Sequence, residues 1–410
     1  MREMKDSGIS WIADIPEHWS VSKIGGLYSL RVTKVSDRDY PPLSVTNKGI
    51  LPQLETAAKT NAHDDRKLVC KGDFAINSRS DRRGSCGISS YTGSVSLINT
   101  ILRPMTEMHP QYYDWLFHTI QFGDEFYKWG HGIVDDLWTT GWQDMKKISI
   151  PTPPITEQAV IADFLDEQCA EIDSLISDIQ SQIEALEEYK RSVITEAVTK
   201  GLDPDVEMRD SGVQWIGEIP THWTLIRIGS LYGLRTQKVS DIDYPPLSVT
   251  KMGVLPQLDT VAKTNAHDDR KLVVKGDFVI NSRSDRRGSC GISDYTGSVS
   301  LINTVLFPIT EMNPRYYNWY FHTVGFADEF YRWGHGIVDD LWTTGWHYMK
   351  NILISVPPLD EQQRIADYLD SKCAEIDNII TEKKQQIETI EEYKKSLIFE
   401  YVTGKKEVQA

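Results

Sequence analysis

Two long segments of the chain carry apolar residues at heptad spacing. Between Thr156 and Thr199 no glycine or proline interrupts the sequence, and apolar residues recur every seven positions from Leu165 onward. The same pattern returns within residues 360–410, with a single polar break at Lys383. A sustained seam of this kind predicts a long helix that packs against another helix. The two helices are each other's simplest partners. We expect an antiparallel pair, because a parallel pair would press together the globular regions that precede the helices.

The regions before the two helices have the pattern of compact mixed domains. Short apolar runs alternate with turn residues from Val21 to about Leu102, which is typical of short strands. Four of these runs are strand candidates, at residues 43–45, 67–69, 74–76 and 95–97. We expect a helix over 112–127 that packs on these strands, and a last strand over 147–151. Residues 6–19 predict a loop with a short amphipathic turn.

The predicted fold class is therefore α+β. It comprises two globular mixed α/β domains, each followed by a long helix, with the helices paired as an antiparallel coiled coil of pseudo-two-fold symmetry. The expected boundaries are 1–155 and 204–359 for the domains, and 156–203 and 360–410 for the helices.

The chain is one unit used twice. The polar stretch Ile76–Ser89 recurs letter for letter as Ile280–Ser293, 204 residues later, and Trp129–Trp142 recurs as Trp333–Trp346. All 12 tryptophans form pairs at the same offset. The function has to explain why two copies are needed.

The net charge of −15 at first argues against a nucleic-acid ligand. The distribution of the charge changes that interpretation. Residues 157–200 hold 11 acidic and 3 basic side chains, and residues 360–406 hold 11 acidic and 8 basic side chains. The acidity thus sits mainly in the predicted helices, and the rest of the chain is near neutral with local basic clusters. The sequence shows no apolar leader, no membrane-spanning run and no metal-type spacing among its five cysteines. We therefore expect a cytoplasmic protein with free thiols.

The repeated polar stretch is the strongest candidate for chemistry, because residues 77–83 are small and polar and carry three guanidinium groups. Arginine offers a rigid fork that binds guanine edges or phosphate, and asparagine can bind adenine in the same way. The alternative is a surface loop whose arginines pair with Asp81 and neighbouring acids. With polar and aromatic residues that we expect nearby, the candidate DNA contacts are Lys34, Thr46, Asn77, Ser78, Arg79, Ser80, Arg82, Arg83, His131, Trp138 and Thr139 in the first copy, and Lys238, Thr250, Asn281, Ser282, Arg283, Ser284, Arg286, Arg287, His335, Trp342 and Thr343 in the second.

Histidine–aspartate groups invite a metal or an acid–base interpretation. They are residues 63–65 and His131/Asp135 with its copy His335/Asp339. Glycines that flank His131 favour a ligand-facing loop instead, and no third or fourth metal ligand is evident. The sequence also lacks phosphate-binding, dinucleotide-binding and nucleophile-elbow motifs. We predict a non-catalytic reader with no metal. An enzyme with two active sites at these histidines and a structural coiled-coil scaffold are the alternatives.

Further stretches recur in both copies and carry a family resemblance. In the first copy they are Asp6–Trp19, Lys71–Phe74, Ile150–Gln158, Ile161–Leu165 and Ile172–Leu175. With them the whole chain resembles the specificity subunit of type I restriction–modification systems. The resemblance implies a non-catalytic protein whose recognition domains each bind one half of a two-part target in double-stranded DNA. It also implies helices that space the domains and dock two methyltransferase subunits, and restriction subunits that join the complex. S-adenosylmethionine is then expected on the methyltransferase and no cofactor on this chain.

One feature departs from the usual pattern of that family, whose two recognition domains differ. Here the two domains are nearly the same, so we predict a gapped inverted repeat, because a two-fold protein recognises a two-fold site. The half-sites are expected to diverge where the copies differ in polar regions, as at Asn47/Lys251, Lys48/Met252 and Ser90/Asp294.

Overall fold

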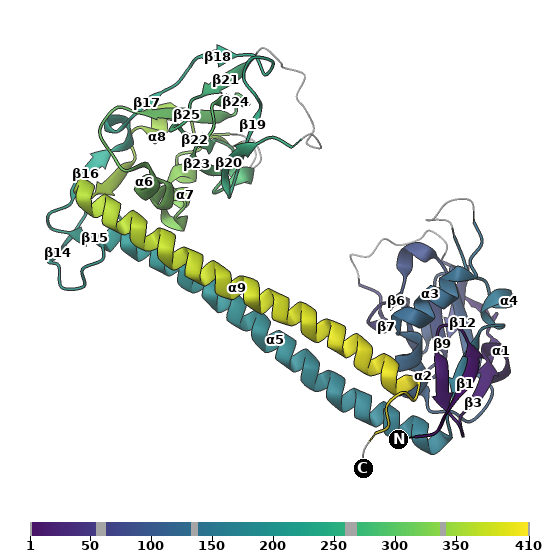
Figure 1. The fold of residues 1–410 in the computed structure, drawn as a ribbon. Coiled ribbons are helices and arrows are strands. Elements are labelled where there is room, and N and C mark those ends of the chain that lie inside the picture. The colour runs from purple at the N-terminus through teal and green to yellow at the C-terminus, as the bar shows by residue number, and fades with distance from the viewer. Residues whose placement is uncertain (1, 55–62, 133–137, 259–268, 337–341, 409–410) are drawn as a thin grey trace. The chain divides into compact units, whose positions relative to one another are not determined.

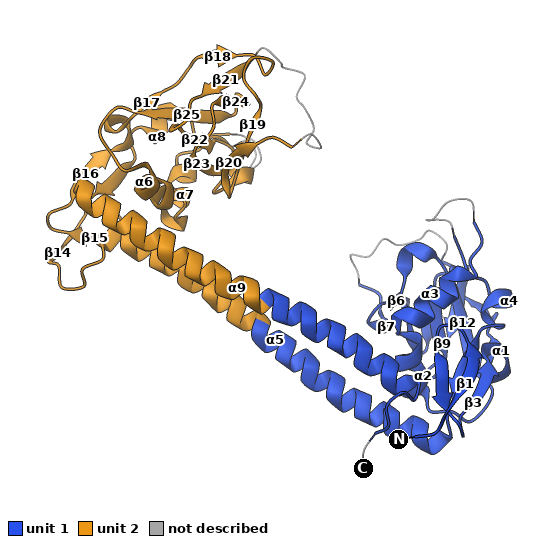
Figure 2. Cartoon of the chain, viewed as in Figure 1, with its two compact units in different colours: residues 1–179, 384–410 blue, residues 180–383 orange. Residues whose placement is uncertain are grey.

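The computed structural model describes residues 2–54, 63–132, 138–258, 269–336 and 342–408. Its contacts divide the chain into two compact units (Figure 2). Unit 1 comprises residues 1–179 and 384–410, and unit 2 comprises residues 180–383. Each unit holds one globular domain and a segment of each long helix, so the division cuts both helices.

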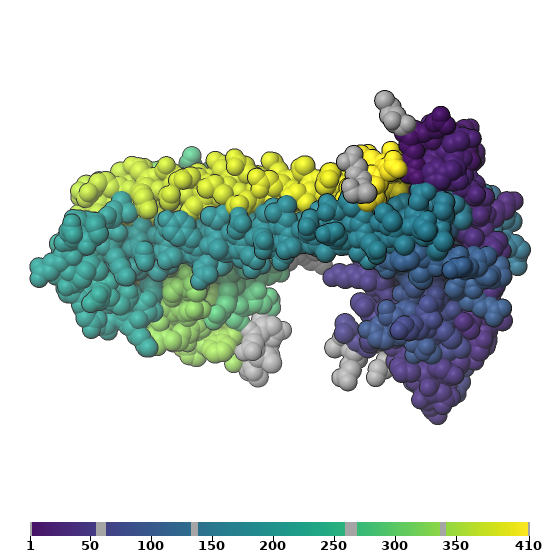
Figure 3. All heavy atoms as spheres, turned by 90° about the horizontal axis from the view of Figure 1, so that it is seen from below, coloured from purple at the N-terminus to yellow at the C-terminus, as the bar shows by residue number. Residues whose placement is uncertain are grey.

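The two predicted helices are α5 (Ile155–Lys200) and α9 (Leu359–Val402), with 46 and 44 residues. In unit 1 the beginning of α5 packs against the end of α9. The rings of Phe164 and Tyr401 are 4.5 Å apart, so residues near opposite ends of the two helices meet. Within each unit the two helix segments lie side by side in both views (Figure 1 and Figure 3). The predicted antiparallel pairing is confirmed.

Two matching ion pairs show the register of this coiled coil. In unit 1, Lys394 Nζ lies 2.6 Å from Asp173 Oδ1. In unit 2, Lys190 Nζ lies 2.6 Å from Asp377 Oδ2. Each residue of one pair is the repeat equivalent of a residue of the other pair. Both units therefore pair their helix segments in the same register.

The heptad seam is buried along both helices. Its buried members include Leu165, Ile172, Ile179, Ile183 and Val193 of α5 and Leu369, Ile376, Ile380 and Leu397 of α9. At the break in the seam, Lys383 is half-buried, and its Nζ donates to Gln182 Oε1 at 2.6 Å. The charged side chain is tolerated in the seam because it finds a polar partner on the facing helix.

The globular domain of unit 1 is built from small antiparallel sheets. Its strands are β1 (Met4–Ile9), β2 (Ala13–Pro16), β3 (Ser20–Lys23), β4 (Tyr28–Leu30), β5 (Lys34–Val35), β6 (Leu43–Thr46), β7 (Gly49–Pro52), β8 (Arg66–Val69), β9 (Phe74–Asn77), β10 (Cys86–Ile88), β11 (Gly93–Val95), β12 (Asn99–Pro104) and β13 (Ser149–Thr152). Its short helices are α1 (Ile24–Leu27), α2 (Pro110–Phe117), α3 (Ile120–Lys128) and α4 (Trp142–Met145). The largest sheet has the order β10-β9-β12-β4, and a second has the order β11-β8-β5.

Unit 2 repeats this architecture. Its strands are β14 (Met208–Asp210), β15 (Glu218–Pro220), β16 (Thr224–Arg227), β17 (Tyr232–Leu234), β18 (Lys238–Val239), β19 (Leu247–Thr250), β20 (Gly253–Pro256), β21 (Arg270–Val273), β22 (Phe278–Asn281), β23 (Cys290–Ile292), β24 (Gly297–Val299), β25 (Asn303–Pro308) and β26 (Leu353–Val356). Its short helices are α6 (Pro314–Phe321), α7 (Val324–Arg332) and α8 (Trp346–Met349). The sheet β17-β25-β22-β23 corresponds to the largest sheet of unit 1.

Each globular domain shares one core with the long helices. In unit 1, buried aromatic side chains of the sheet and of α2 and α3 belong to the same cluster as Leu165 of α5 and Leu397 of α9. The hydroxyl of Tyr112 on α2 donates to the carbonyl of Val402 at 2.7 Å. In unit 2, Tyr316 donates to the carbonyl of Val198 at 3.0 Å. Because these apolar contacts are continuous, each domain is anchored on the helix ends of its own unit.

Three local predictions need correction. Residues 6–19 form the β1–β2 hairpin rather than a loop with an amphipathic turn. The predicted helix over 112–127 is two helices, because Thr119 ends α2 and caps α3 by accepting a hydrogen bond from the amide of Phe122 at 3.3 Å. The strand expected at 95–97 ends at Val95. Thr119 is a residue type that favours helix N-caps, and it could have indicated this break within the continuous apolar pattern.

Candidate nucleic-acid interface

The repeated polar stretch forms a loop between the β9 and β10 strands, and its residues 78–85 are called the arginine loop below (282–289 in unit 2). A short 3-10 turn covers Ser80–Arg82. At the base, the amide of Asn77 donates to the carbonyl of Ser85 at 2.8 Å. Gly84 has a φ of 74°, a left-handed conformation that favours glycine. The sequence therefore closes the loop tightly and leaves Arg82 and Arg83 exposed, while Arg79 is half-buried.

Backbone pairing brings residues 138–140 alongside the arginine loop. The amide of Ser80 donates to the carbonyl of Trp138 at 3.0 Å, and the amide of Thr140 donates to the carbonyl of Ser78 at 3.0 Å. Unit 2 makes the same two bonds at 2.9 Å between its equivalent residues. Two segments that lie far apart in the sequence thus form one continuous surface.

His131 extends this surface on its other side. Its amide and carbonyl both pair with Thr139, at 2.9 and 3.1 Å. Thr139 also forms a bridge with Arg79. The imidazole side chain is 77% exposed, so a ligand that covers the arginine loop would meet it.

A buried tyrosine that the sequence analysis did not single out fixes the shape of the loop. Tyr127 of α3 donates its hydroxyl to the carbonyl of Asn77 at 3.0 Å and lies 3.3 Å from the carbonyl of Arg82. Burial raises the pKa of this hydroxyl well above its usual range, so it remains a donor. The guanidinium of Arg83 lies over the ring, 5.4 Å from its centroid. Tyr331 makes the same contacts in unit 2.

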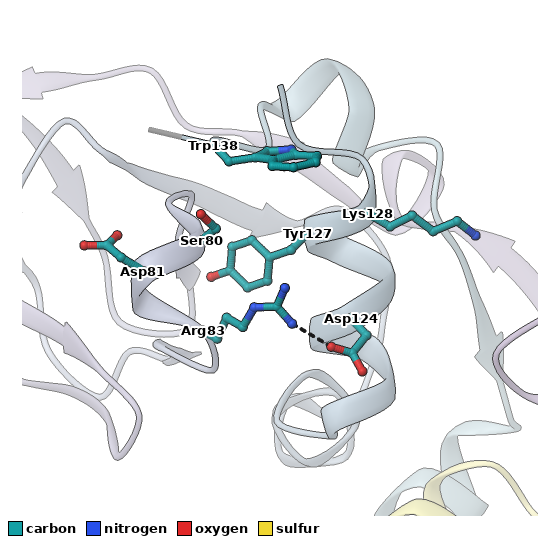
Figure 4. Close-up of a pocket in the computed structure, with 7 residues that line it drawn as sticks. All are labelled: Ser80, Asp81, Arg83, Asp124, Tyr127, Lys128 and Trp138. Atoms are coloured by element: carbon teal, nitrogen blue, oxygen red, sulfur yellow. Dashed lines mark hydrogen bonds and ion pairs between the residues drawn. The ribbon is translucent and has the colours of Figure 1, made fainter. Parts of the chain in front are cut away.

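A cavity of about 740 Å³ opens between the arginine loop and α3 (Figure 4). It is lined by Ser80, Asp81, Arg83, Asp124, Tyr127, Lys128 and Trp138. Arg83 points across it to Asp124, with Nη1 2.7 Å from Oδ1. In unit 2 a cavity of about 520 Å³ lies on the other side of the equivalent loop, between Arg283 and the exposed pair Leu301 and Ile302.

All three arginines of the loop lie near carboxylates, as the surface-loop alternative predicted. Arg79 and Arg82 lie 3.5 and 3.8 Å from Asp81, and Arg83 pairs with Asp124. These ion pairs are at the surface, with the Arg82 side chain 68% exposed. Exposed pairs of this kind contribute little to stability, so a phosphate could replace either carboxylate at small cost. The three guanidinium groups of the loop thus outnumber the two carboxylates that they contact.

Some predicted contacts lie below the surface. Asn77 and Asn281 are both 6% exposed, and Ser282 is also buried. The side-chain oxygen of Asn77 accepts a hydrogen bond from the amide of Arg79 at 3.1 Å. The structure therefore assigns this asparagine to loop closure, in place of the predicted contact with an adenine edge.

Other candidates lie on the surface but are already engaged. Lys34 Nζ lies 2.6 Å from Asp65, and Lys238 pairs with Asp269 in the same way. The hydroxyl of Thr46 donates to the carbonyl of Gly49 at 2.9 Å, as that of Thr250 does at 3.1 Å in its own hairpin. The threonines shape the β6–β7 and β19–β20 turns.

The β6–β7 hairpin packs against β10, the strand that follows the arginine loop, through a contact between two glycines. A Cβ atom on Gly87 would lie 2.9 Å from the Cα of Gly49. In unit 2 the corresponding distance between Gly291 and Gly253 is 2.8 Å. Only glycine allows this approach, which places the two segments side by side.

The metal and acid–base interpretation finds little in the described residues. Asp135 and Asp339 lie outside the described part of the chain. Among the residues that the structure describes, no three His, Cys, Asp or Glu side chains gather as a metal site. His63 lies 3.0 Å from Asp37, which makes a surface ion pair. The described helices also include none that is long and apolar enough to cross a membrane.

Residues 223–389 match the family model described as type I restriction modification DNA specificity domain. The chain is similar to type I specificity subunits, through this domain match, which lies mostly in unit 2, and through relatives that it resembles along most of its length. It is 24% identical to the type I restriction enzyme MjaVIII specificity subunit of Methanocaldococcus jannaschii, over 95% of this chain and 93% of that protein. A putative MjaX specificity subunit of the same organism is 26% identical over 64% of this chain and 60% of its own length.

Solved structures show the same fold. A chain from a study of complex assembly and conformational transition in a type I restriction–modification system matches with a TM-score of 0.70 and 12% identity, over 95% of this chain and 99% of that one. The HsdS subunit from Thermoanaerobacter tengcongensis matches with a TM-score of 0.53 and 14% identity, over 95% and 98%. The predicted α+β fold is confirmed. The comparisons support the predicted resemblance to the specificity subunits of type I restriction–modification systems.

Proposed function

We propose that each recognition domain binds one half-site of a bipartite DNA target, and that the two half-sites are inverted copies of one sequence except where the side chains that face DNA differ between the units. One observation carries this proposal: the arginine loop is held by the same bonds in both units. Tyr127 and Tyr331 donate to the carbonyls of Asn77 and Asn281 at 3.0 and 2.9 Å. Loops of identical sequence in identical frameworks present the same chemistry to DNA.

In this proposal the framework positions the loop and the arginines contact the DNA. The guanidinium groups of Arg79, Arg82 and Arg83 would exchange their carboxylate partners for phosphates or for guanine edges. Trp138 and Thr139, held beside them by backbone bonds, would supply apolar and hydroxyl contacts to the same groove. Because the bonds among backbone atoms already exist, little ordering would be needed on binding.

We further propose that the paired helices space the two half-sites and dock two methyltransferase subunits, which would bind S-adenosylmethionine. Exposed tyrosines at repeat-equivalent positions support such docking. Tyr189 of α5 and Tyr393 of α9 are 50% and 55% exposed, and tyrosine is enriched at protein interfaces. Restriction subunits would join the same complex.

The test is methylation mapping. The chain is co-expressed with its cognate methyltransferase, and modified adenines are located across a genome at single-base resolution. A gapped motif with matching half-sites in inverted orientation is the expected result. A gapped motif with unrelated half-sites would contradict the two-fold proposal. No methylation by a demonstrably active methyltransferase would favour the scaffold alternative.

A further inference from the structure

The two units differ at one corner of the proposed DNA-binding surface, beside the arginine loop. In unit 1, Asp144 of α4 lies with Oδ2 3.3 Å from His131 Nε2 and Oδ1 2.9 Å from Lys147 Nζ. In unit 2, tyrosine takes the place of that aspartate. The ring of Tyr348 stacks on that of His335, with 4.3 Å between centroids and 17° between planes.

Two further positions beside this contact also differ between the units. Asn351 stands where unit 1 has Lys147, and its Nδ2 donates to the carbonyl of His347 at 2.9 Å. His347 in turn replaces Gln143. Unit 1 therefore presents a carboxylate between two basic side chains, and unit 2 presents a flat aromatic pair without an acidic group. The two corners are defined by residues 131, 143, 144 and 147 and by 335, 347, 348 and 351.

The corner belongs to the same surface as the arginine loop. His131 pairs by its backbone with Thr139, and Thr139 bridges to Arg79. The equivalent bridges link His335, Thr343 and Arg283 in unit 2. A duplex that covers the arginine loop would thus extend over the histidine and the residue that contacts it.

The two corners suit different base edges. Lys147 holds the pKa of Asp144 below its usual range, and His131 lowers it further, so the carboxylate stays ionised and can only accept. A carboxylate in the major groove accepts a hydrogen bond from the amino group of cytosine. The stacked rings of unit 2 offer apolar contact instead, which suits the methyl group of thymine.

We propose that Asp144 and Tyr348 are specificity-determining residues that make the two half-sites differ at one base pair. The half-site bound by unit 1 carries a cytosine facing its corner, and the half-site bound by unit 2 carries a thymine. The target is then an inverted repeat with one mismatched position. This inference rests on the proposed function, since it needs both arginine loops on DNA.

The test exchanges the corners within the full chain. One variant is Q143H/D144Y/K147N, which gives unit 1 the corner of unit 2. The reciprocal variant is H347Q/Y348D/N351K. Each introduces side chains that the other unit already carries on an equivalent backbone, and thermal unfolding would verify that both variants fold.

Methylation by the complex with the cognate methyltransferase is then mapped for wild type and both variants. We expect the wild-type motif to differ between half-sites at one position. The first variant should make the two half-sites match at the thymine, and the reciprocal variant at the cytosine. The change in preference at that position should be on the order of tenfold or more.

A second variant, N47K/K48M, exchanges the turn residues at which the sequence predicts that the half-sites diverge, and so tests that prediction against the corner. These residues lie in the β6–β7 turn and not at the corner. If the preference followed this exchange, or if the corner variants methylated the unchanged wild-type motif, the inference would be wrong while the proposed function stood. If the wild-type complex itself methylated no site, both the inference and the proposed function would be wrong.

Discussion

Unit 1 and unit 2 hold the arginine loop in the same bonds but surround it with different side chains at the corner. The loop is supported from below by Tyr127 or Tyr331 and from the side by residues 138–140 or 342–344, with matching distances. The corner has a carboxylate in one unit and a stacked tyrosine in the other. A framework that depends on many mutual contacts resists change, whereas an exposed side chain can change alone without cost to the fold.

The largest expected effect comes from reversing the charge of the shared loop. R82E/R83E in unit 1 should reduce the affinity of the methyltransferase complex for target DNA by about 100-fold or more, because two cations that face phosphates become anions. The salt dependence should weaken, with the slope of log K against log salt falling by about 2. Affinity titrations at several salt concentrations measure both effects.

The comparison between units sharpens this test. R286E/R287E in unit 2 should reduce the affinity for target DNA by the same factor if both loops make the same contacts. The control R191E/K395E makes the same charge change on exposed residues of the long helices and should leave the affinity within a few-fold. Equal affinity for all three variants would contradict a DNA-binding role for the loops.

The contact between glycines predicts the next largest effect. Gly87→Ala should lower the free energy of unfolding by about 1–3 kcal/mol, because the new methyl group meets the backbone of Gly49. Gly291→Ala should have the same effect in unit 2. Gly26→Ala is the control, since no atom lies within 4 Å of its added Cβ. Denaturant unfolding of the full chain would measure the free energy of unfolding of all three variants. An unchanged value for Gly87→Ala would show that the β6–β7 hairpin can move away from β10.

Removal of the buried hydroxyl tests how the loop is held. Tyr127→Phe leaves the carbonyl of Asn77 without its donor and should lower the free energy of unfolding by about 1–2 kcal/mol. DNA affinity should fall several-fold, because the loop loses its fixed shape. Tyr331→Phe should cause the same two losses in unit 2. Tyr91→Phe, which alters an exposed ring between β10 and β11, should change neither quantity. A stable Tyr127→Phe variant with full affinity would show that the backbone bonds to residues 138–140 suffice.

The smallest effect concerns a natural difference below the loop. Asp114 Oδ1 accepts from the amide of Ile88 at 2.8 Å, and Asn318 plays the same part in unit 2. Burial raises the pKa of Asp114, although nearby His118 opposes the shift. The folded protein therefore binds this proton more tightly than the unfolded chain, so stability is lost as the pH rises from the pKa of an ordinary carboxyl group through the folded pKa.

Asp114→Asn should accordingly stabilise the protein at neutral pH, because the amide keeps the hydrogen bond without a buried charge. The gain should shrink as the pH falls through the folded pKa towards that of an ordinary carboxyl group, because the wild-type side chain is then neutral too. Asn318→Asp should lower the free energy of unfolding at neutral pH, and this loss should shrink as the pH falls. Unfolding measured from pH 4 to 8 is the readout, and a gain that grows at acid pH would contradict the assigned cause.

Much of the architecture followed from local pattern. The heptad spacing identified both long helices, and Lys383 as the one break in the seam, because helix periodicity and burial act over a few residues. The repeat showed that two equivalent domains exist, and the arginines marked the loop that we propose to contact DNA. These features depend on residue type and on spacing along the chain, and both can be obtained from the sequence alone.

Only the tertiary structure decided which of those residues can act together. Asn77 looked like a base-contacting residue, but it is buried and closes the loop. Tyr127 had no distinguishing sequence signal, because the repeat preserves its neighbours equally well. The contact of His131 with Asp144 joins residues from a loop and a following helix, and its change to a ring stack in unit 2 depends on where the folded backbone places both side chains. Burial and long-range contacts are properties of the packed chain, and spacing along the sequence does not specify them.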